Sequence, residues 1–434
     1  MKHWFKDHHF KSLLKNSGYL VASKAVSAVS GLATLAFAGR SLGLVTFGML
    51  ILIVSYAKAA SGLSKFQSWQ LIVRYGGRVL TGGDSKEFKA STGFAFALDL
   101  VSGFGGMALA ILLLPFLANK VGITDQYLIA AMFYCTLLPT MGSATPSGVL
   151  RALDRFDLIS WQGSTYPIVR AVLAGIAWAM DARFEVFLLI WYVTDLGGDL
   201  YLWFLAWREM RRRDLLSEIH PTLLPQTLPG AWRFAIFANL TSSLGTAWGP
   251  IGRLIVGGFL GPAGAAIYRV ASSLADAAQR PADLLAKAYY PEVVRMDLAS
   301  KKPWKLMLRG TVLATSFGLV AVLLLLVGGR QLVGAVFGSE FLPAYPVLMV
   351  LILVPLLATI SFPLPSMHYA LDRPDAPLKA RLVGTVTYFA VVVPLIGRWE
   401  VIGAAVAFVI GYAAMVAALI IQLFAEYRRV RVKR

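Results

Sequence analysis

IYRVASSLADAAQRPADLLAKAYYP, residues 267–291, carries charged side chains on one side of a helix in a chain that is 57% hydrophobic. Arg269, Asp276 and Arg280 recur at i, i+7 and i+11, so that in a helix they form one polar stripe. Such a stripe is typical of a surface helix in a soluble protein, and equally of a helix that faces water inside a membrane. The composition of the whole chain decides between the two settings.

That composition is too apolar for a soluble globular protein. Charged residues make up 15% of the 434 positions and the mean hydropathy is +0.66, whereas about a quarter of the residues of a soluble domain are charged. The charges are crowded into short intervals, and the apolar runs between them reach the roughly 20 residues that a helix needs to cross a hydrocarbon layer. The sequence therefore predicts an all-α polytopic membrane protein.

Twelve apolar runs are long enough to span the membrane, and they fall into two groups of six. They cover about 17–40, 45–65, 92–117, 125–147, 158–180, 184–207, 232–258, 263–288, 306–328, 341–365, 379–397 and 400–425. Between the second and third runs, residues 66–80 mix apolar and aromatic residues with Arg74 and Arg78. This segment is predicted to lie along the membrane interface.

Lysine and arginine gather before the first span, after the last one and in the loops that follow the even-numbered spans. Arg373, Lys379 and Arg381 are assigned to such a loop, the one after the tenth span. Because basic loops remain inside, both termini are predicted to be cytoplasmic. The net charge of +18 thus reflects topology and attraction to anionic membrane lipids, and gives no indication of nucleic-acid binding.

Several charged side chains fall deep inside the predicted spans. Near the span ends, Arg233, Lys65 and Lys287 are expected to extend their charged groups to the headgroup region. The deeper cations are Lys24, Lys58, Arg170, Arg253, Arg269 and Arg280, and the acids at similar depth are Asp99, Asp195, Asp199 and Asp276. Six lipid-facing cations would cost roughly 15–20 kcal/mol. They are therefore expected to face one another, carboxylates, or water.

Two arrangements satisfy these charges. In the first, the excess of cations over acids lines a hydrated passage, which would attract an anionic ligand. Here the six cations are the candidates for binding the headgroup of a substrate, and the four acids are candidates for ion coupling. In the second, the charges close off pairwise within helix interfaces as salt bridges. Asp195 and Asp199 share a helix face in either case.

The chain contains an internal repeat. AGRSLGLVTFG (38–48) and VGGFLGPAGAAIY (256–268) each end an apolar span in Leu-Gly and start another after a short turn. Aligning Leu42 with Leu260 also sets Lys58 opposite Asp276. We therefore predict two six-helix lobes, 1–220 and 221–434, related by a parallel pseudo-twofold axis along the membrane normal.

Three stretches carry a resemblance to a known family: NSGYLVASKAVSAVSGLATLAFAGRSLGLVTFG (16–48), GVLRALDRFDLI (148–159) and RLIVGGFLGPAGAAIYRVASSLADAAQRPADLLAKAYYPEV (253–293). They resemble the O-antigen and polysaccharide flippases, which move lipid-linked oligosaccharides, of the multidrug/oligosaccharidyl-lipid/polysaccharide exporter superfamily. The resemblance spans nearly the whole chain and rests on spaced glycines, apolar pattern and basic residues.

The resemblance implies a function and a setting. It implies two lobes around a central cavity in the bacterial inner membrane, and alternating access coupled to a gradient of H+ or Na+. The implied substrate is undecaprenyl diphosphate carrying a sugar repeat unit, which moves from the cytoplasmic to the periplasmic leaflet for surface polysaccharide biosynthesis. Other polysaccharide assembly proteins are candidate partners, and no cofactor is expected.

Two other functions are less compatible with the sequence. A membrane-embedded glycosyltransferase or polymerase is disfavoured because the loops are short and the five histidines are scattered; the single cysteine, Cys135, is interpreted as a small core residue. A drug/ion antiporter of the same superfamily would favour acids over bases in its lumen, since its drugs are cations. The sequence therefore predicts a carrier and no enzyme.

Overall fold

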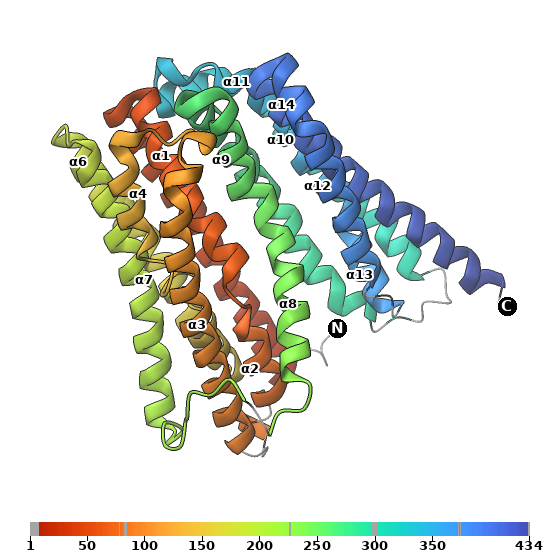
Figure 1. Cartoon of the computed structure of the whole chain (residues 1–434). Coiled ribbons are helices and arrows are strands. Elements are labelled where there is room, and N and C mark those ends of the chain that lie inside the picture. The colour runs from red at the N-terminus through yellow and green to blue at the C-terminus, as the bar shows by residue number, and fades with distance from the viewer. Residues whose placement is uncertain are drawn as a thin grey trace. The chain divides into compact units, whose positions relative to one another are not determined.

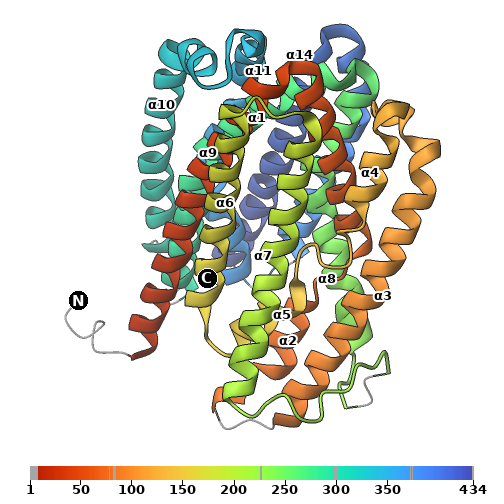
Figure 2. The same cartoon turned by 90° about the vertical axis from the view of Figure 1, so that its left-hand side faces the viewer.

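A computed structural model describes residues 8–77, 79–81, 85–224, 227–294, 296, 302–371, 373 and 375–432. Every regular element in these ranges is a helix, which confirms the predicted all-α class. Seven of the helices are long and apolar enough to cross a membrane. Figure 1 shows the helices coloured from red at the N-terminus to blue at the C-terminus, and Figure 2 shows α6 and α7 side by side.

The chain divides into two compact units by its contacts. Unit 1 is Met1–Leu42 with Leu52–Thr246, and unit 2 is Gly43–Ile51 with Ala247–Arg434. The helices are α1 (His8–Ser64), shared by both units, then in unit 1 α2 (Ser68–Gly76), α3 (Ser85–Leu117), α4 (Leu128–Cys135), α5 (Ala144–Ala152), α6 (Phe156–Ala179), α7 (Phe184–Arg212) and α8 (Ala231–Thr246). Unit 2 holds α9 (Gly252–Val294), α10 (Lys302–Phe337), α11 (Ala344–Leu351), α12 (Leu353–Ser361), α13 (Pro363–Ala370) and α14 (Asp375–Val432).

Short turns link some of these helices. Four are 3-10 turns, Val79–Thr81, Asn119–Val121, Asp125–Tyr127 and Ser339–Phe341, and one is a π-helical turn, Ala247–Ile251. In unit 2, α9 packs against α11, α12, α13 and α14 and so forms the centre of its bundle. The predicted lobes, 1–220 and 221–434, were defined by duplicated sequence and not by contacts, so they stay a prediction.

The twelve predicted spans all coincide with helical segments. The first two spans lie in α1, the last two lie in α14, and the seventh runs through α8 and the π-helical turn into α9. Two predicted spans are broken: the fourth into α4 and α5, and the tenth into α11, α12 and α13. The segment predicted to lie along the interface forms α2, with Leu71 and Ile72 as its buried apolar side chains, and its place at the membrane surface stays a prediction.

The internal repeat is visible in the backbone. At Gly43 the dihedral angles are φ 68° and ψ 174°, and at Gly261 they are φ 70° and ψ −174°. Only glycine adopts this region readily, because a Cβ atom would clash there. The Leu-Gly pairs that define the repeat therefore turn the chain in the same way, and the pseudo-twofold axis stays a prediction.

A second duplicated feature is a charge cluster at the ends of helices. The sequences LDRFD (153–157) and LDRPD (371–375) occur at the same spacing as Leu42 and Leu260. In unit 1, Arg155 donates to Asp157 at 2.9 and 2.8 Å and to Glu209 at 2.5 Å. In unit 2, Arg373 donates to Asp375 at 3.1 Å and also to Glu426. We call these clusters the unit 1 clamp and the unit 2 clamp.

The unit 1 clamp lowers the pKa of Asp157, its partly exposed acid. The hydrogen bonds from Arg155 hold the pKa of Asp157 below the ordinary value of a carboxyl group. Because the folded form lowers this pKa, the clamp stabilises the fold above the unfolded-state pKa of Asp157 and loses that contribution as the pH falls through the folded-state pKa.

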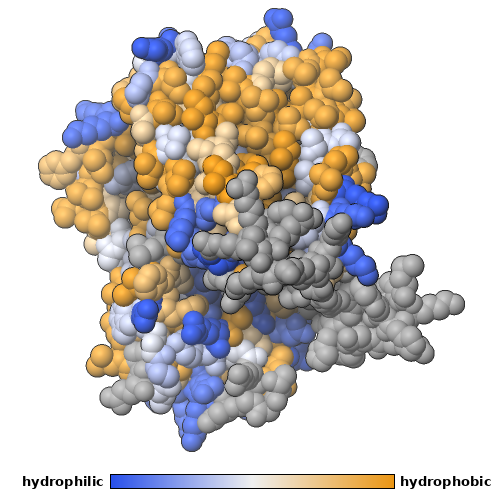
Figure 3. All heavy atoms as spheres, turned by 90° about the vertical axis from the view of Figure 1, so that its right-hand side faces the viewer, coloured by the Kyte–Doolittle hydropathy of each residue, from blue (hydrophilic) through white to orange (hydrophobic). Residues whose placement is uncertain are grey.

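The exterior is apolar over wide areas, as expected next to lipid. Figure 3 shows apolar side chains covering much of one face, with hydrophilic side chains gathered below them. On α10, the exposed side chains include Leu308, Val312, Leu313, Val320, Leu323, Leu324 and Val327. A soluble protein seldom exposes so much contiguous apolar surface. The chain is therefore a multi-pass membrane protein.

Candidate functional site

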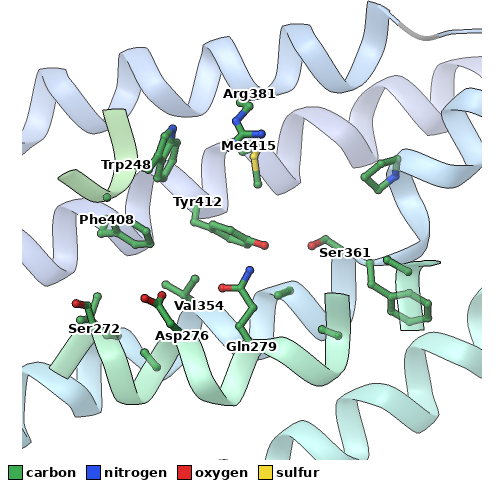
Figure 4. A pocket seen from close by; sticks show the side chains of 18 of the residues that line it. Trp248, Ser272, Asp276, Gln279, Val354, Ser361, Arg381, Phe408, Tyr412 and Met415 are labelled. Atoms are coloured by element: carbon green, nitrogen blue, oxygen red, sulfur yellow. The ribbon is translucent and has the colours of Figure 1, made fainter. Parts of the chain in front are cut away.

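Unit 2 contains an open cavity of about 580 Å³, whose mostly apolar walls carry several polar and charged side chains. Its walls come from the π-helical turn and from α9, α11, α12, α13 and α14. The polar and charged side chains on the walls include Arg253, Tyr268, Ser272, Asp276, Gln279, Ser361, Arg381 and Tyr412. Figure 4 shows Asp276 and Gln279 of α9 pointing across the cavity toward Tyr412, with Arg381 on the opposite wall.

The polar stripe of α9 explains part of this wall. Ser272, Asp276 and Gln279 are spaced at i, i+4 and i+7, so they share the helix face that lines the cavity. Arg269 and Arg280, the other charges of the stripe, are half-buried and lie outside the lining. Arg269 nevertheless interacts electrostatically with Arg253 and Asp276. The stripe therefore contributes both a wall and a nearby positive charge.

An aromatic cluster closes one end of the cavity. The indole of Trp248 stacks on Tyr388 at 5.6 Å and meets Phe408 edge-on at 5.2 Å, while its Nε1 donates to Thr385 Oγ1 at 2.9 Å. A buried indole N–H requires such an acceptor. With Trp248 fixed in this way, the cluster forms a rigid apolar surface beside the charged wall.

Arg381 is a charged cavity residue that was not among the candidates predicted from the sequence. It was assigned to the cytoplasmic loop, but α14 begins at Asp375 and carries Arg381 into the lining. The assignment to a loop was wrong: Arg381 lies inside the predicted eleventh span, 379–397, and α14 begins four residues before that span. The cytoplasmic side of this helix end stays a prediction. A usable signal was present: Pro377 lies four residues before Arg381, and proline is frequent in the first turn of a helix.

The deep charges are distributed unequally between the units. Among the described residues of unit 2 they are Arg253, Arg269, Arg280 and Arg381 with Asp276. In unit 1 they are Lys24, Lys58, Lys65 and Arg170 with Asp99, Asp195 and Asp199. The excess of positive formal charge that the sequence predicted is therefore concentrated in unit 2, the unit that contains the cavity.

Unit 1 contains a largely buried ion pair. The sequence had left open whether its deep charges line a water-filled passage or pair with one another. Arg170 on α6 pairs with Asp195 on α7, and its Nε donates to Thr194 Oγ1 at 2.7 Å. The hydroxyl of Tyr134 donates to the other oxygen of Asp195 at 2.6 Å. For Arg170 the pairwise arrangement therefore holds, and its role in headgroup binding stays a prediction.

The remaining acids of unit 1 also have described partners. Asp99, which is 4% exposed, accepts from Ser68 Oγ at 2.6 Å and from both the backbone N and the Oγ1 of Thr145, at 3.0 and 2.7 Å. Asp199 accepts from Ser143 Oγ at 2.8 Å. Lys58 is exposed and interacts electrostatically with Asp195 and Asp199, whereas Lys24 lies exposed elsewhere on α1.

Two further expectations concern single residues. Lys65 was expected to extend to the headgroup region, but it is 7% exposed and its Nζ donates to the carbonyls of Pro139 and Met141. That prediction was wrong because the break between α4 and α5 offers carbonyl acceptors inside unit 1. Cys135 is buried, which confirms its interpretation as a core residue.

The comparison with known sequences decides the family. No protein-family model matches the chain. The chain is 41% identical over 348 residues to the inner membrane protein YghQ of Escherichia coli (strain K12), which covers 80% of this chain and 98% of that protein. The chain belongs to the YghQ family.

Solved structures show which fold this YghQ-family chain adopts. The inward closed conformation of the lipid II flippase MurJ matches with a TM-score of 0.72 at 11% identity, over 93% of this chain and 86% of that one. An outward-facing multidrug resistance transporter of the MATE family of the MOP superfamily matches with a TM-score of 0.64 at 14% identity, over 97% and 96%. The YghQ-family chain therefore has the fold of the MOP superfamily, and these neighbours are flippases and transporters, not enzymes.

Proposed function

We propose that this protein is a flippase for polyprenyl diphosphate-linked oligosaccharides. It moves undecaprenyl diphosphate with its sugar repeat unit from the cytoplasmic to the periplasmic leaflet, by alternating access, for surface polysaccharide biosynthesis. The cavity of unit 2 carries the proposal, since it joins Arg253 and Arg381 to neutral polar groups and an aromatic surface. The proposal includes cytoplasmic termini, on the strength of the basic loops alone.

The chemistry of the cavity suits this headgroup. A diphosphate carries negative charge, and guanidinium groups form strong, frequently bidentate hydrogen bonds to phosphate oxygens. Gln279, Ser272 and Ser361 offer donors and acceptors for sugar hydroxyls. A volume of about 580 Å³ lies within the range of small-molecule sites.

Export of cationic drugs is the second candidate. Asp276 on the cavity wall favours it, because a carboxylate can pair with a cationic drug. Two arginines share the same lining, however. A cation would meet net repulsion there and an anion net attraction, so we favour the diphosphate.

Replacing Arg253 and Arg381 together by glutamine is expected to cut translocation strongly. A hydrogen bond to a charged group contributes about 1.5–3 kcal/mol, so each arginine accounts for about a tenfold to hundredfold change in rate. The assay reconstitutes the full chain in vesicles with a fluorescent polyprenyl diphosphate oligosaccharide and scores leaflet exchange.

The control for that assay is Arg330→Gln. Arg330 is an exposed arginine of α10 outside the cavity lining, so its removal should leave translocation near the wild-type rate. All variants are compared at matched protein levels and matched thermal unfolding midpoints. If the folded double variant exchanges the lipid as fast as wild type, the headgroup site is not in this cavity.

Coupling to an ion gradient gives a second test of the mechanism. The buried acids Asp99, Asp195 and Asp199 lie in a cluster with lysines and an arginine, an arrangement common along ion and proton pathways in transporters. We expect turnover to fall when ionophores collapse both the H+ and the Na+ gradient across the vesicle membrane. Equal rates with and without gradients would show that transport is uncoupled.

A further inference from the structure

A lysine from a distant segment donates hydrogen bonds into the break between α4 and α5. Lys65 follows α1 directly, and its Nζ donates to the carbonyl oxygens of Pro139 at 3.0 Å and Met141 at 2.6 Å. Pro139 and Met141 lie in the turn region between α4 and α5. Within the described residues, no following helical turn supplies backbone N–H donors to their carbonyl oxygens. A main-chain carbonyl that accepts no backbone N–H keeps its partial negative charge unpaired, so a cation is favoured beside it.

On the other side of the same break, a carboxylate caps the next helix. Asp99 accepts the backbone N–H and the hydroxyl of Thr145, in the first turn of α5. The side chain of Asp99 is almost fully buried, and Ser68 supplies a third donor. A negative group at this position satisfies orphan N–H groups and matches the helix dipole. The break therefore holds a positive group at one end and a negative group at the other.

Lys65 is coordinated as a bound cation would be, and not as one partner of a salt bridge. Its two hydrogen bonds both go to main-chain carbonyls. It interacts electrostatically with Asp99 and Asp199, yet no ion pair joins Lys65 to either of them among the described residues. Unwound carbonyls with carboxylates nearby form the donor set that transporters use to coordinate a monovalent cation at a broken helix.

We infer that Lys65 is a tethered cation: its ammonium occupies a monovalent-cation site formed by the Pro139 and Met141 carbonyls beside Asp99 and Asp199. While the ammonium is in place, this site in unit 1 takes up neither Na+ nor K+. Removing the ammonium leaves an empty site with oxygen ligands, which a free cation can occupy. The inference concerns the ion and stands independently of the lipid that the protein transports.

The test compares ion-dependent stability of the purified full chain with and without the ammonium. Lys65→Ala and wild type are unfolded in NaCl, KCl, ethylammonium chloride or N-methyl-D-glucamine chloride at equal ionic strength. The control is Lys89→Ala, because Lys89 is a mostly buried lysine of unit 1 whose partners are the side chains of Ser217 and Glu218. Only the K65A variant should gain a saturable stabilisation by Na+, K+ or ethylammonium.

The expected size follows from mass action. At a cation concentration ten times its Kd, the ratio of folded to unfolded K65A should rise about tenfold over the value in N-methyl-D-glucamine. If K65A does not fold in that buffer, the same cations should restore folding during solubilisation. The inference is overturned if none of the small cations stabilises or restores K65A, or if wild type shows the same dependence.

Discussion

Gly48→Ala is expected to destabilise unit 2 by about 3 kcal/mol or more, an unusually large effect for one methyl group. A Cβ atom at Gly48 would lie 1.9 Å from the carbonyl oxygen of Pro262 and 2.4 Å from its carbonyl carbon. Both atoms belong to the backbone and cannot rotate away. The two segments would have to separate, and Phe47, fully buried and packed edge-on against Phe341 at 5.6 Å, would lose contacts.

The measurement is the free energy of unfolding, or the thermal midpoint, in one detergent. Gly31→Ala is the matched control, since Gly31 lies in the same helix α1 and a Cβ atom there would meet nothing within 4 Å. Alanine favours helix over glycine by about 1 kcal/mol, so the control should be neutral or stabilising. A G48A variant as stable as wild type would show that these backbones do not approach so closely.

The helices could be predicted from the sequence because each apolar run must lie in lipid or protein. The turn at Gly43 was also predictable, since the Leu-Gly pair recurs at Gly261. The break after Cys135 was not. Prolines such as Pro139 are common within membrane helices. Whether one breaks a helix depends on what satisfies the freed carbonyls, and here that group is Lys65, 74 positions away from Pro139.

Candidate site residues were predicted less well, for a related reason. The sequence shows how deep a charge lies along a span, but not which neighbour it meets. It predicted Arg253 and Asp276, which do line the cavity, but placed Arg381 in a loop. Arg381 lies six residues into α14, about 9 Å along the helix axis. Side-chain direction is set by packing between helices, which the apolar pattern does not specify.

The two clamps contain the same residue types but are expected to contribute differently to the stability of the two units. Each joins an arginine to an aspartate two residues on and to a glutamate at the end of a later helix. The side chain of Glu209 is 4% exposed, and that of Glu426 is 17% exposed. Glu209 also accepts from Arg213 at 3.0 Å. Because less water screens the unit 1 clamp, its charges interact more strongly.

Glu209→Gln is therefore expected to cost about 1.5–3 kcal/mol, the range for hydrogen bonds to a charged group. The amide keeps the shape of the side chain but leaves Arg155 and Arg213 without their buried carboxylate. Glu426→Gln removes the corresponding group from the unit 2 clamp, and there the loss should be smaller, because more water screens the charges. Unfolding of both variants and wild type in one detergent measures the difference. Equal losses, or a larger loss for E426Q, would mean that burial does not decide the strength of the duplicated clamp.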